Sequence, residues 1–292
     1  MRRLFFIAGL LVSLVSVSHA QRPSIGVLDL GATPFAQKTT EKLRDRLRSI
    51  DEFSVADPDL IRSAAKGIGY SGSLNLSVSE ARDLGAALAT DFYIIGDVQT
   101  LRRSASTRPV FYESYCSVFL VNARSGELLF WDRTSLQSDQ AAETEDRMWS
   151  EILNAGIAER IALAIRRAQS RDRKERLEQA AVNGEPLIQE APDDDKAAEA
   201  QGVRLPRPYV RLRPEYPDTA ARAEAEATVD VLVDVGADGE VGNVRVARWA
   251  GFGLDEMTVA TVRKMHFFPA MKNGSPIAMR VLLRYNFRKP PR

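Results

Sequence analysis

The sequence has little of the side-chain chemistry that enzymes and metal sites use. It contains one cysteine, Cys116, and two histidines, His19 and His266. A single cysteine forms no internal disulfide, and the apolar run around Cys116 favours a buried small residue over a reactive thiol. His266 precedes Phe267 and Phe268, where we expect it to pack at a helix end. A hydrolytic triad or a histidine metal site needs partners that orient and activate it, and none is recognisable. We therefore expect a protein that is not an enzyme, with no catalytic residue, metal or cofactor.

The charge balance and the glycine pattern argue against two further classes of protein. The chain has 40 basic and 39 acidic residues, which argues against nucleic acid as the main partner. The glycines at positions 67, 69 and 72 form no phosphate-binding motif, because no Gly-Lys-Ser/Thr follows them. After Ala20 no apolar run approaches the length of a membrane span.

The N-terminal segment has the layout of a secretory signal peptide. Arg2 and Arg3 precede an apolar stretch over residues 4–17, and Ser18 and Ala20 supply small residues before a cut. The stretch is shorter than the roughly 20 residues that a spanning helix needs. We expect cleavage before Gln21 and a periplasmic protein. In the alternative interpretation the segment stays uncleaved in the inner membrane, and only then does the protein contact a membrane.

Composition divides the rest of the chain into three regions. We expect an α/β domain over residues 21–168, a charged flexible linker over 169–206, and a second domain over 207–292. The linker lacks aromatic residues and has too few apolar residues to form a core, although its first part can continue the preceding helix. Its acidic run at 193–195 is interpreted as a solvated charge run and not as a metal site.

Strands and helices alternate in the first region. The apolar run over 25–30 predicts a buried strand, and apolar residues at helical spacing over 43–50 predict an amphipathic helix. Ser77 and Glu80 form a capping box that begins another helix. Further strands are expected over 53–56, 91–98, 110–123 and 128–136, the last two joined as a hairpin, and one helix over 141–168. This order predicts a mixed sheet with helices packed on it.

The second domain shows clear strand periodicity. Valines at 229, 231, 233 and 235 alternate with other residues, and Asp238-Gly239 follows as a hairpin turn. A helix is expected after Gly253 and a last strand over 277–287. We therefore predict an α+β chain that ends in a three-stranded antiparallel sheet with helices. On the last strand, one face holds Met279, Val281, Leu283, Tyr285 and Phe287, and the other holds Arg280, Arg284 and Asn286.

These residues, in this order, resemble the C-terminal domain of TonB. The resemblance covers residues 209–287, with Ala227 where the family usually has glycine. The motifs that carry it are Tyr216-Pro217-Asp218-Thr219-Ala220, Asp238-Gly239, Phe268-Pro269-Ala270, Gly274-Ser275-Pro276 and Phe287.

The first domain carries a second, weaker resemblance. The strand over 25–30, the helix after it, the segment over 84–96 and the hairpin over 120–127 resemble the periplasmic α/β domain of TolB N-terminal, CsgG and FlgO-like proteins. This resemblance implies a fold and no specific role.

The TonB resemblance implies a function and a site. The family grips an extended segment of an outer-membrane receptor, and the physical means is the addition of a strand to an open sheet edge. The edge would be the last strand, and the partner an outer-membrane or periplasmic protein. The residues that the resemblance places in partner binding are Glu215, Tyr216, Pro217, Ile277, Met279, Arg280, Leu282 and Arg284.

Three of these assignments have alternatives. Glu215 stands where the family often has glutamine, so a carboxylate here favours a different, cationic contact. Tyr216 and Pro217 can simply set the turn into the domain. Arg280 and Arg284 can be plain solvated residues of the outer face.

The chain departs from TonB itself in the anchor and the spacer. TonB is held in the inner membrane by an uncleaved helix that meets a proton-driven motor, and it carries a long proline-rich spacer. Neither is recognisable in this sequence, and His19 lies beside the expected cut. We therefore expect a periplasmic binding or scaffold protein whose two domains are joined by a flexible linker. The alternative is an energy transducer for outer-membrane transport.

Overall fold

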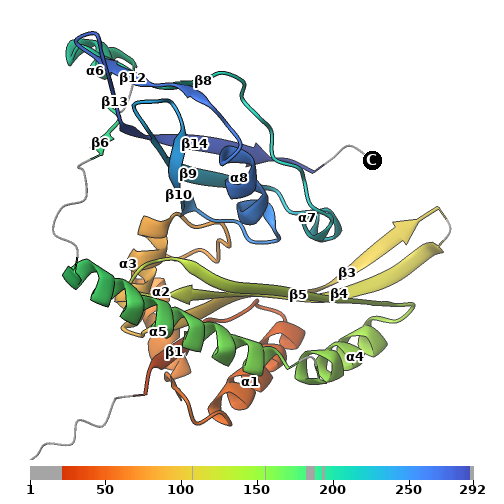
Figure 1. Cartoon of the computed structure of the whole chain (residues 1–292). Helices are drawn as coiled ribbons and strands as arrows, with labels where there is room; N and C mark the ends of the chain where they lie inside the picture. Colours follow the sequence, from red (N-terminus) through yellow and green to blue (C-terminus); the bar gives the residue numbers. More distant parts are fainter. Residues whose placement is uncertain (1–21, 107, 155, 182–187, 193–194, 290–292) are drawn as a thin grey trace, which may run out of the picture.

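The computed structural model places the C-terminal part of the chain on top of the sheet of the N-terminal part (Figure 1). It describes residues 22–106, 108–154, 156–181, 188–192 and 195–289. The expected signal peptide, residues 1–20, lies outside the described residues. Within the described ranges, no helix combines the length and the apolar character that crossing a membrane requires.

The N-terminal part is built on a mixed sheet of five strands, as the sequence predicts. The strand order is β2-β1-β3-β4-β5, in which β1 pairs in parallel with β2 and β3, and the long strands β3, β4 and β5 pair antiparallel. The β3–β4 hairpin extends beyond the rest of the molecule (Figure 1). The strands are β1 Ser24–Val27, β2 Ser54–Val55, β3 Phe92–Ala105, β4 Arg108–Asn122 and β5 Leu128–Ser138.

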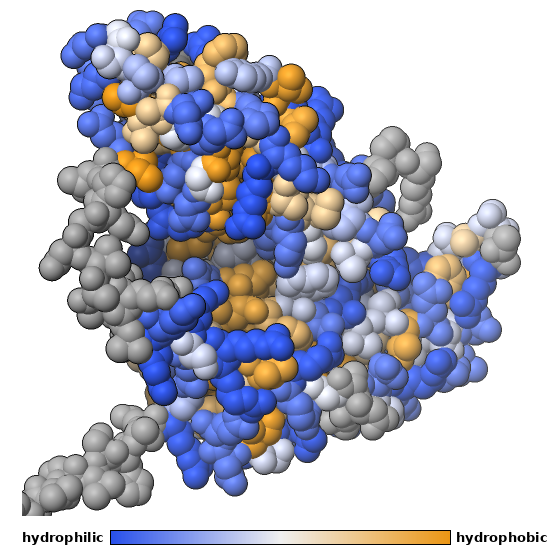
Figure 2. All heavy atoms as spheres, viewed as in Figure 1, coloured by the Kyte–Doolittle hydropathy of each residue, from blue (hydrophilic) through white to orange (hydrophobic). Residues whose placement is uncertain are grey.

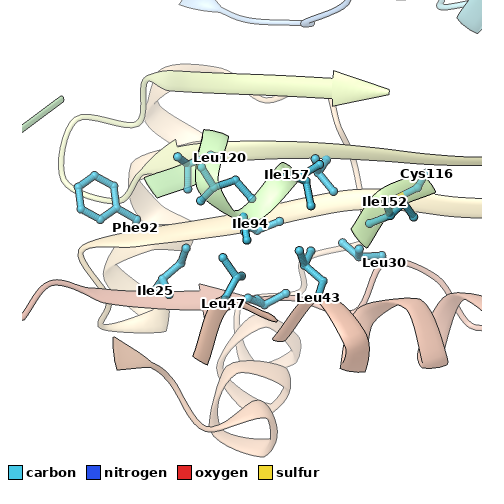
Figure 3. Close-up of a cluster of buried hydrophobic side chains, with 14 of the residues drawn as sticks. Ile25, Leu30, Leu43, Leu47, Phe92, Ile94, Cys116, Leu120, Ile152 and Ile157 are labelled. Atoms are coloured by element: carbon cyan, nitrogen blue, oxygen red, sulfur yellow. The ribbon is translucent and has the colours of Figure 1, made fainter. Parts of the chain in front are cut away.

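Helices pack on both faces of this sheet. The cluster drawn in Figure 3 lies between the sheet and α1, α4 and α5, and it includes Leu43 of α1, Ile152 of α4 and Ile94 of β3. Cys116 is buried in the same cluster, as predicted. A second cluster packs α2 and α3 on the opposite face. The helices are α1 Pro34–Arg48, α2 Pro58–Gly67, α3 Val78–Leu88, α4 Ala141–Asn154 and α5 Ile157–Ala181.

Two helical features differ from the sequence expectation. Helix α2 was not predicted, although Asp57 caps it through the N–H groups of Asp59 and Leu60 and Pro58 occupies its first turn. The single helix expected over 141–168 is two helices, α4 and α5. Gly156, with φ of +63°, lies between them, because a left-handed residue interrupts the helical hydrogen bonds. The capping box of Ser77 and Glu80 at the start of α3 is confirmed.

The C-terminal part contains the predicted three-stranded antiparallel sheet, β10-β9-β14. Its core face packs against α8, where Leu254 and Val262 meet the valines of β9. At the β9–β10 turn, Gly239 has φ of +83°, and a Cβ there would lie 2.0 Å from the oxygen of Phe267, so the turn requires glycine. The elements are α7 Asp218–Ala223, β9 Ala227–Val235, β10 Val241–Arg248, α8 Leu254–Val262 and β14 Met279–Phe287.

The segment expected to be a flexible linker is partly folded. Helix α5 runs to Ala181, and short elements follow from residue 189 onward. Ala198 and Val203 are buried in the C-terminal core, which explains why this polar segment holds a fixed path. The short elements are β6 Gln189–Glu190, α6 Asp195–Ala200, β7 Val203–Arg204, β8 Arg207–Pro208, β11 Phe267–Phe268, β12 Ala270–Lys272 and β13 Ser275–Ile277.

Candidate partner-binding edge

Strand β14 lies beside β9 over its whole length, and its two faces differ as predicted. Met279 and Phe287 belong to the buried core. The opposite face places Leu282 directly across from Leu232 of β9. Leu282 is 52% exposed, so this face presents an apolar side chain to solvent.

The two arginines of this face are held by carboxylates of β9. Arg280 donates from Nε to Asp234 at 2.6 Å and from Nη2 at 3.0 Å. Arg284 binds Asp230 in the same two-bond manner, at 2.7 and 2.9 Å. Both aspartates are buried. These paired side chains keep β14 in register with β9, because a fork of two parallel bonds fixes orientation as well as charge.

The backbone of β14 shows which groups face away from β9. In an antiparallel pair, residues alternate between bonding the neighbour with both backbone groups and directing both outward. The oxygens of Arg280 and Arg284 accept bonds from outside the β9–β14 pair, so the even-numbered residues direct their backbone groups outward. The outward groups of residues 280, 282, 284 and 286 are called the β14 rim below.

The β14 rim is partly covered by the chain itself, which corrects the expectation of an open last strand. Strand β6 pairs in parallel with Met279 and Arg280, and the N–H of Ala191 donates to the oxygen of Arg280 at 2.8 Å. Four residues further on, the guanidinium of Arg211 donates to the oxygen of Arg284 at 2.8 Å. Between these two contacts, the N–H and oxygen of Leu282 have no partner within the part of the chain that the structure describes.

The remaining predicted site residues lie in different places. Ile277 belongs to β13, where it pairs with Ala270 of β12, so its assignment to the last strand was wrong. Tyr216 donates to the oxygen of Ala225 at 2.7 Å and its ring faces Phe287, and Pro217 precedes α7 at its N-cap. These contacts give both residues a structural role in the turn. Glu215 is exposed.

A contact between the two domains was missed by the sequence interpretation. Trp249, which follows β10, is buried and stacks on Phe119 of β4, with 6.2 Å between the two ring centres. Phe252 packs against Phe119 in a T-shaped arrangement, with 5.4 Å between the ring centres. Figure 2 shows apolar residues gathered along this junction. Besides the segment that connects them along the chain, the two domains therefore meet through an aromatic surface.

Polar contacts fix the same junction. The amide of Asn75 donates to the oxygens of Thr228 and Trp249 and accepts from the N–H of Thr228, at 2.7 to 3.0 Å. Arg248 donates to the oxygen of Asn75 and pairs with Glu80 at 3.1 Å. Asn75 thereby satisfies backbone groups of the C-terminal domain that would otherwise be left unpaired by docking.

A buried carboxylate holds the loop that carries Trp249. Asp255, in the first turn of α8, accepts from the N–H groups of Ala250 and Gly251 at 2.9 and 2.8 Å. Burial raises the pKa of Asp255 to about 7, against the opposing effect of these two amide bonds. The loop geometry and the protonation of Asp255 are therefore linked.

Metal ligands are not clustered in the part of the chain that the structure describes. No three His, Cys, Asp or Glu side chains in this part of the chain gather to hold a metal ion. His266 was expected to pack, but it is exposed and bonds Glu240 at 2.9 Å, because the chain leaves α8 before reaching it.

A cleft of about 1070 Å³ lies between the first sheet and α7. The buried carboxylate of Glu113 on its floor pairs with Arg103 and Arg133, at 3.0 and 3.5 Å. Glu224, which follows the last residue of α7, also pairs with Arg103. Arg102 and Arg222 also line the cleft, so its charged side chains are four arginines and two glutamates.

The comparison with known families agrees with the motifs of the last domain. Residues 213–288 match the family model described as the Gram-negative bacterial TonB protein C-terminal. The predicted resemblance is thus confirmed, and the segment that carries the β14 rim is a TonB C-terminal domain. No curated protein matches the chain significantly.

Several solved structures resemble parts of the chain. The Pseudomonas aeruginosa TonB C-terminal domain is 20% identical with a TM-score of 0.27, covering 36% of this chain and 98% of its own. The hypothetical protein CT253 of Chlamydia trachomatis is 11% identical, with a TM-score of 0.34 and coverages of 48% and 98%. The lipoprotein GNA1162 of Neisseria meningitidis is 12% identical, with a TM-score of 0.32 and coverages of 46% and 96%. Likenesses this low carry no argument about function.

Proposed function

We propose that this protein, whose residues 213–288 form a TonB C-terminal domain, is a non-enzymatic binding or scaffold protein of the cell envelope. It recognises an extended segment of an outer-membrane or periplasmic protein by strand addition to β14. The observation that carries the proposal is the rim at Leu282, where backbone groups face outward beside an exposed apolar side chain.

Strand addition follows from what an unpaired edge presents. A row of free N–H and C=O groups is a template for another extended chain, and the side chains on either face of the edge give selectivity. Here the outer face offers Leu282 and Leu232 between two neutralised Arg–Asp pairs. This surface suits a segment with an apolar residue at its centre. The flanking residues of that segment need no charge, because each arginine on the surface is already paired with an aspartate.

The first test replaces Leu282 by proline in the full chain. Because the N–H of Leu282 faces outward, Leu282→Pro removes a rim donor and leaves the β9–β14 hydrogen bonds in place. Bead-bound wild-type protein is expected to retain an envelope protein from an extract. Leu282→Pro is expected to retain at least ten-fold less of that protein.

Leu282→Ala is the matched control, because it removes the same side chain and keeps the N–H donor. It is expected to retain several-fold more of the partner than the proline variant. Circular dichroism spectra of both variants check that they are folded. If Leu282→Pro retains the partner as well as Leu282→Ala does, backbone pairing at β14 is the wrong mechanism.

The proposed location is the periplasm, and it depends on the layout of residues 1–20. Removal of this segment predicts Gln21 as the first residue of the purified protein. An intact Met1 in a membrane fraction would instead support the anchored transducer. Sequencing of the N-terminus of protein purified from its native envelope distinguishes the two.

A further inference from the structure

Strand β6 occupies the beginning of the β14 rim. Gln189 lies opposite Met279, and Glu190 lies opposite Arg280. The N–H of Ala191 donates to the oxygen of Arg280, and the carboxylate of Glu190 lies 4.0 Å from the same arginine. A segment from before the TonB C-terminal domain therefore already forms a fourth strand at the edge on which the proposed function depends.

This fourth strand is a weak one. It is two residues long, and both side chains are exposed, so it buries little apolar surface. By contrast, β9 pairs with all nine residues of β14. One net hydrogen bond changes an equilibrium by roughly 2- to 12-fold, so two residues of pairing can be exchanged for a longer strand.

A second contact covers the rim at Arg284. Arg211 donates to the oxygen of Arg284, and its guanidinium lies 5.4 Å from the ring centre of Tyr285. This is a side-chain contact at an exposed position, and it can move without any change in the backbone. Between the two contacts, Leu282 presents both of its rim groups unpaired within the described ranges.

We infer that β6 is a displaceable occupant of the β14 rim, and that a partner strand binds by first pairing at Leu282 and then replacing β6. The inference rests on the proposed function, and it adds that β6 regulates the access of a partner strand to β14. The partner is an extended protein segment with an apolar residue beside Leu282. Because β6 is tethered to the same chain, it competes at a high effective concentration. Its presence lowers the affinity of the rim for any other strand.

The experiment measures this competition with the chain's own sequence as the probe. A fluorescein-labelled peptide of residues 186–192, Pro-Leu-Ile-Gln-Glu-Ala-Pro, is titrated with the full chain, and binding is followed by fluorescence anisotropy. Ala191→Pro removes the donor to Arg280 and weakens the internal strand. The variant is expected to bind the peptide at least five-fold more tightly than the wild type.

A second variant shows whether the gain in peptide affinity comes from the weakened β6 strand or from a folding defect caused by the proline. The double change Gln189→Gly with Glu190→Gly weakens β6 without a proline, and it is expected to give the same gain. Hydrogen exchange of the wild type adds an independent readout: the amide of Ala191 should exchange at least 100-fold faster than that of Val281, which lies in the β9–β14 pair.

The inference is overturned if neither variant binds the peptide more tightly than the wild type, or if the amide of Ala191 exchanges as slowly as that of Val281. Failure of the proposed function looks different, because retention of the envelope partner would then be insensitive to Leu282→Pro. If that retention depends on Leu282 but is unchanged by both β6 variants, strand addition stands and the competition by β6 is rejected.

Discussion

The indole nitrogen of Trp249 donates to the backbone oxygen of Gly126 at 3.0 Å, across the junction of the two domains. Trp249 comes from the loop after β10, and Gly126 from the hairpin between β4 and β5. Gly126 has φ of +73°, and a Cβ there would lie 2.2 Å from the oxygen of Val78. A turn that requires glycine therefore supplies the acceptor for a fully buried tryptophan of the C-terminal domain. Together with the hydrogen bonds of Asn75 and Arg248, this bond holds the C-terminal domain on the N-terminal one.

Replacing Trp249 is expected to uncouple the two domains. Trp249→Phe keeps an aromatic ring but leaves the oxygen of Gly126 unpaired, which costs about 1–3 kcal/mol. Trp249→Ala also opens a cavity against Phe119 and costs about 3–5 kcal/mol. Urea unfolding followed by circular dichroism should show one transition for the wild type and two for Trp249→Ala.

Trp149→Phe is the control for this prediction. The indole of Trp149 donates to Thr39 at 2.9 Å within the first domain, so its loss removes a similar bond without touching the junction. It should lower stability and leave the unfolding curve with the same number of transitions. If Trp149→Phe also unfolded in two transitions, as Trp249→Ala is expected to do, the role given to Trp249 would be contradicted.

Gly251 is expected to tolerate no side chain. It has φ of +71°, and a Cβ would lie 2.5 Å from the ring of Phe119. Gly251→Ala therefore combines left-handed strain of about 1–2 kcal/mol with a clash at the junction. Gly69 has φ of +72° and open space around it, so Gly69→Ala carries the strain alone. Thermal melting should place Gly251→Ala clearly below Gly69→Ala, and equal melting temperatures would show that the junction is not tightly packed.

The stability of the protein is expected to depend on pH through Asp255. Burial raises the pKa of this carboxyl to about 7 in the folded state, whereas an unfolded aspartate titrates near 3.9. The folded state thus holds the proton more tightly. The contribution of Asp255 to stability is complete below about pH 4 and is lost as the pH rises through about 7. The expected slope is at most about 1.4 kcal/mol per pH unit.

Asp255→Asn isolates this effect, because asparagine cannot titrate. The difference in free energy of unfolding, wild type minus Asp255→Asn, should fall between pH 4 and 7 in urea titrations. A difference that stays constant over this range would show that Asp255 remains ionised in the folded protein.

The thiol of Cys116 is expected to be inert in the folded protein. It is buried between the sheet and the helices, and this burial raises its pKa to about 12. Because the thiolate is the reactive form, a thiol reagent at pH 8 should label the folded protein at least 100-fold more slowly than the protein unfolded in guanidinium. Rapid labelling without denaturant would contradict this burial.

Local sequence patterns were sufficient for most of the fold. The alternating valines at 229–235 predicted β9 and the face that it buries, and Ser77 with Glu80 marked the start of α3. The motifs from Tyr216 to Phe287 indicated the family of the last domain. Each of these signals is a short-range one, since a strand's period, a cap or a turn is set by residues a few positions apart.

The break at Gly156 and the helix after Asp57 could also have been read locally. Pro58 after a capping aspartate is a common helix start, and a glycine within a long helical pattern is a candidate stop. The sequence therefore contains local signals for both features.

Short-range patterns thus indicated the two sheets, their buried faces, the family of the C-terminal domain and its last strand apart from where that strand begins. Only the tertiary structure decided that Trp249 joins the domains, that Ile277 leaves the last strand, and that β6 and Arg211 cover parts of the β14 rim. The reason is that the contacts of Trp249, Arg211 and β6 join residues 73 to 123 positions apart and have no periodicity along the chain. A polar dipeptide such as Gln189-Glu190 looks the same in a linker and in a strand. Its conformation is set by the unpaired backbone groups that it meets.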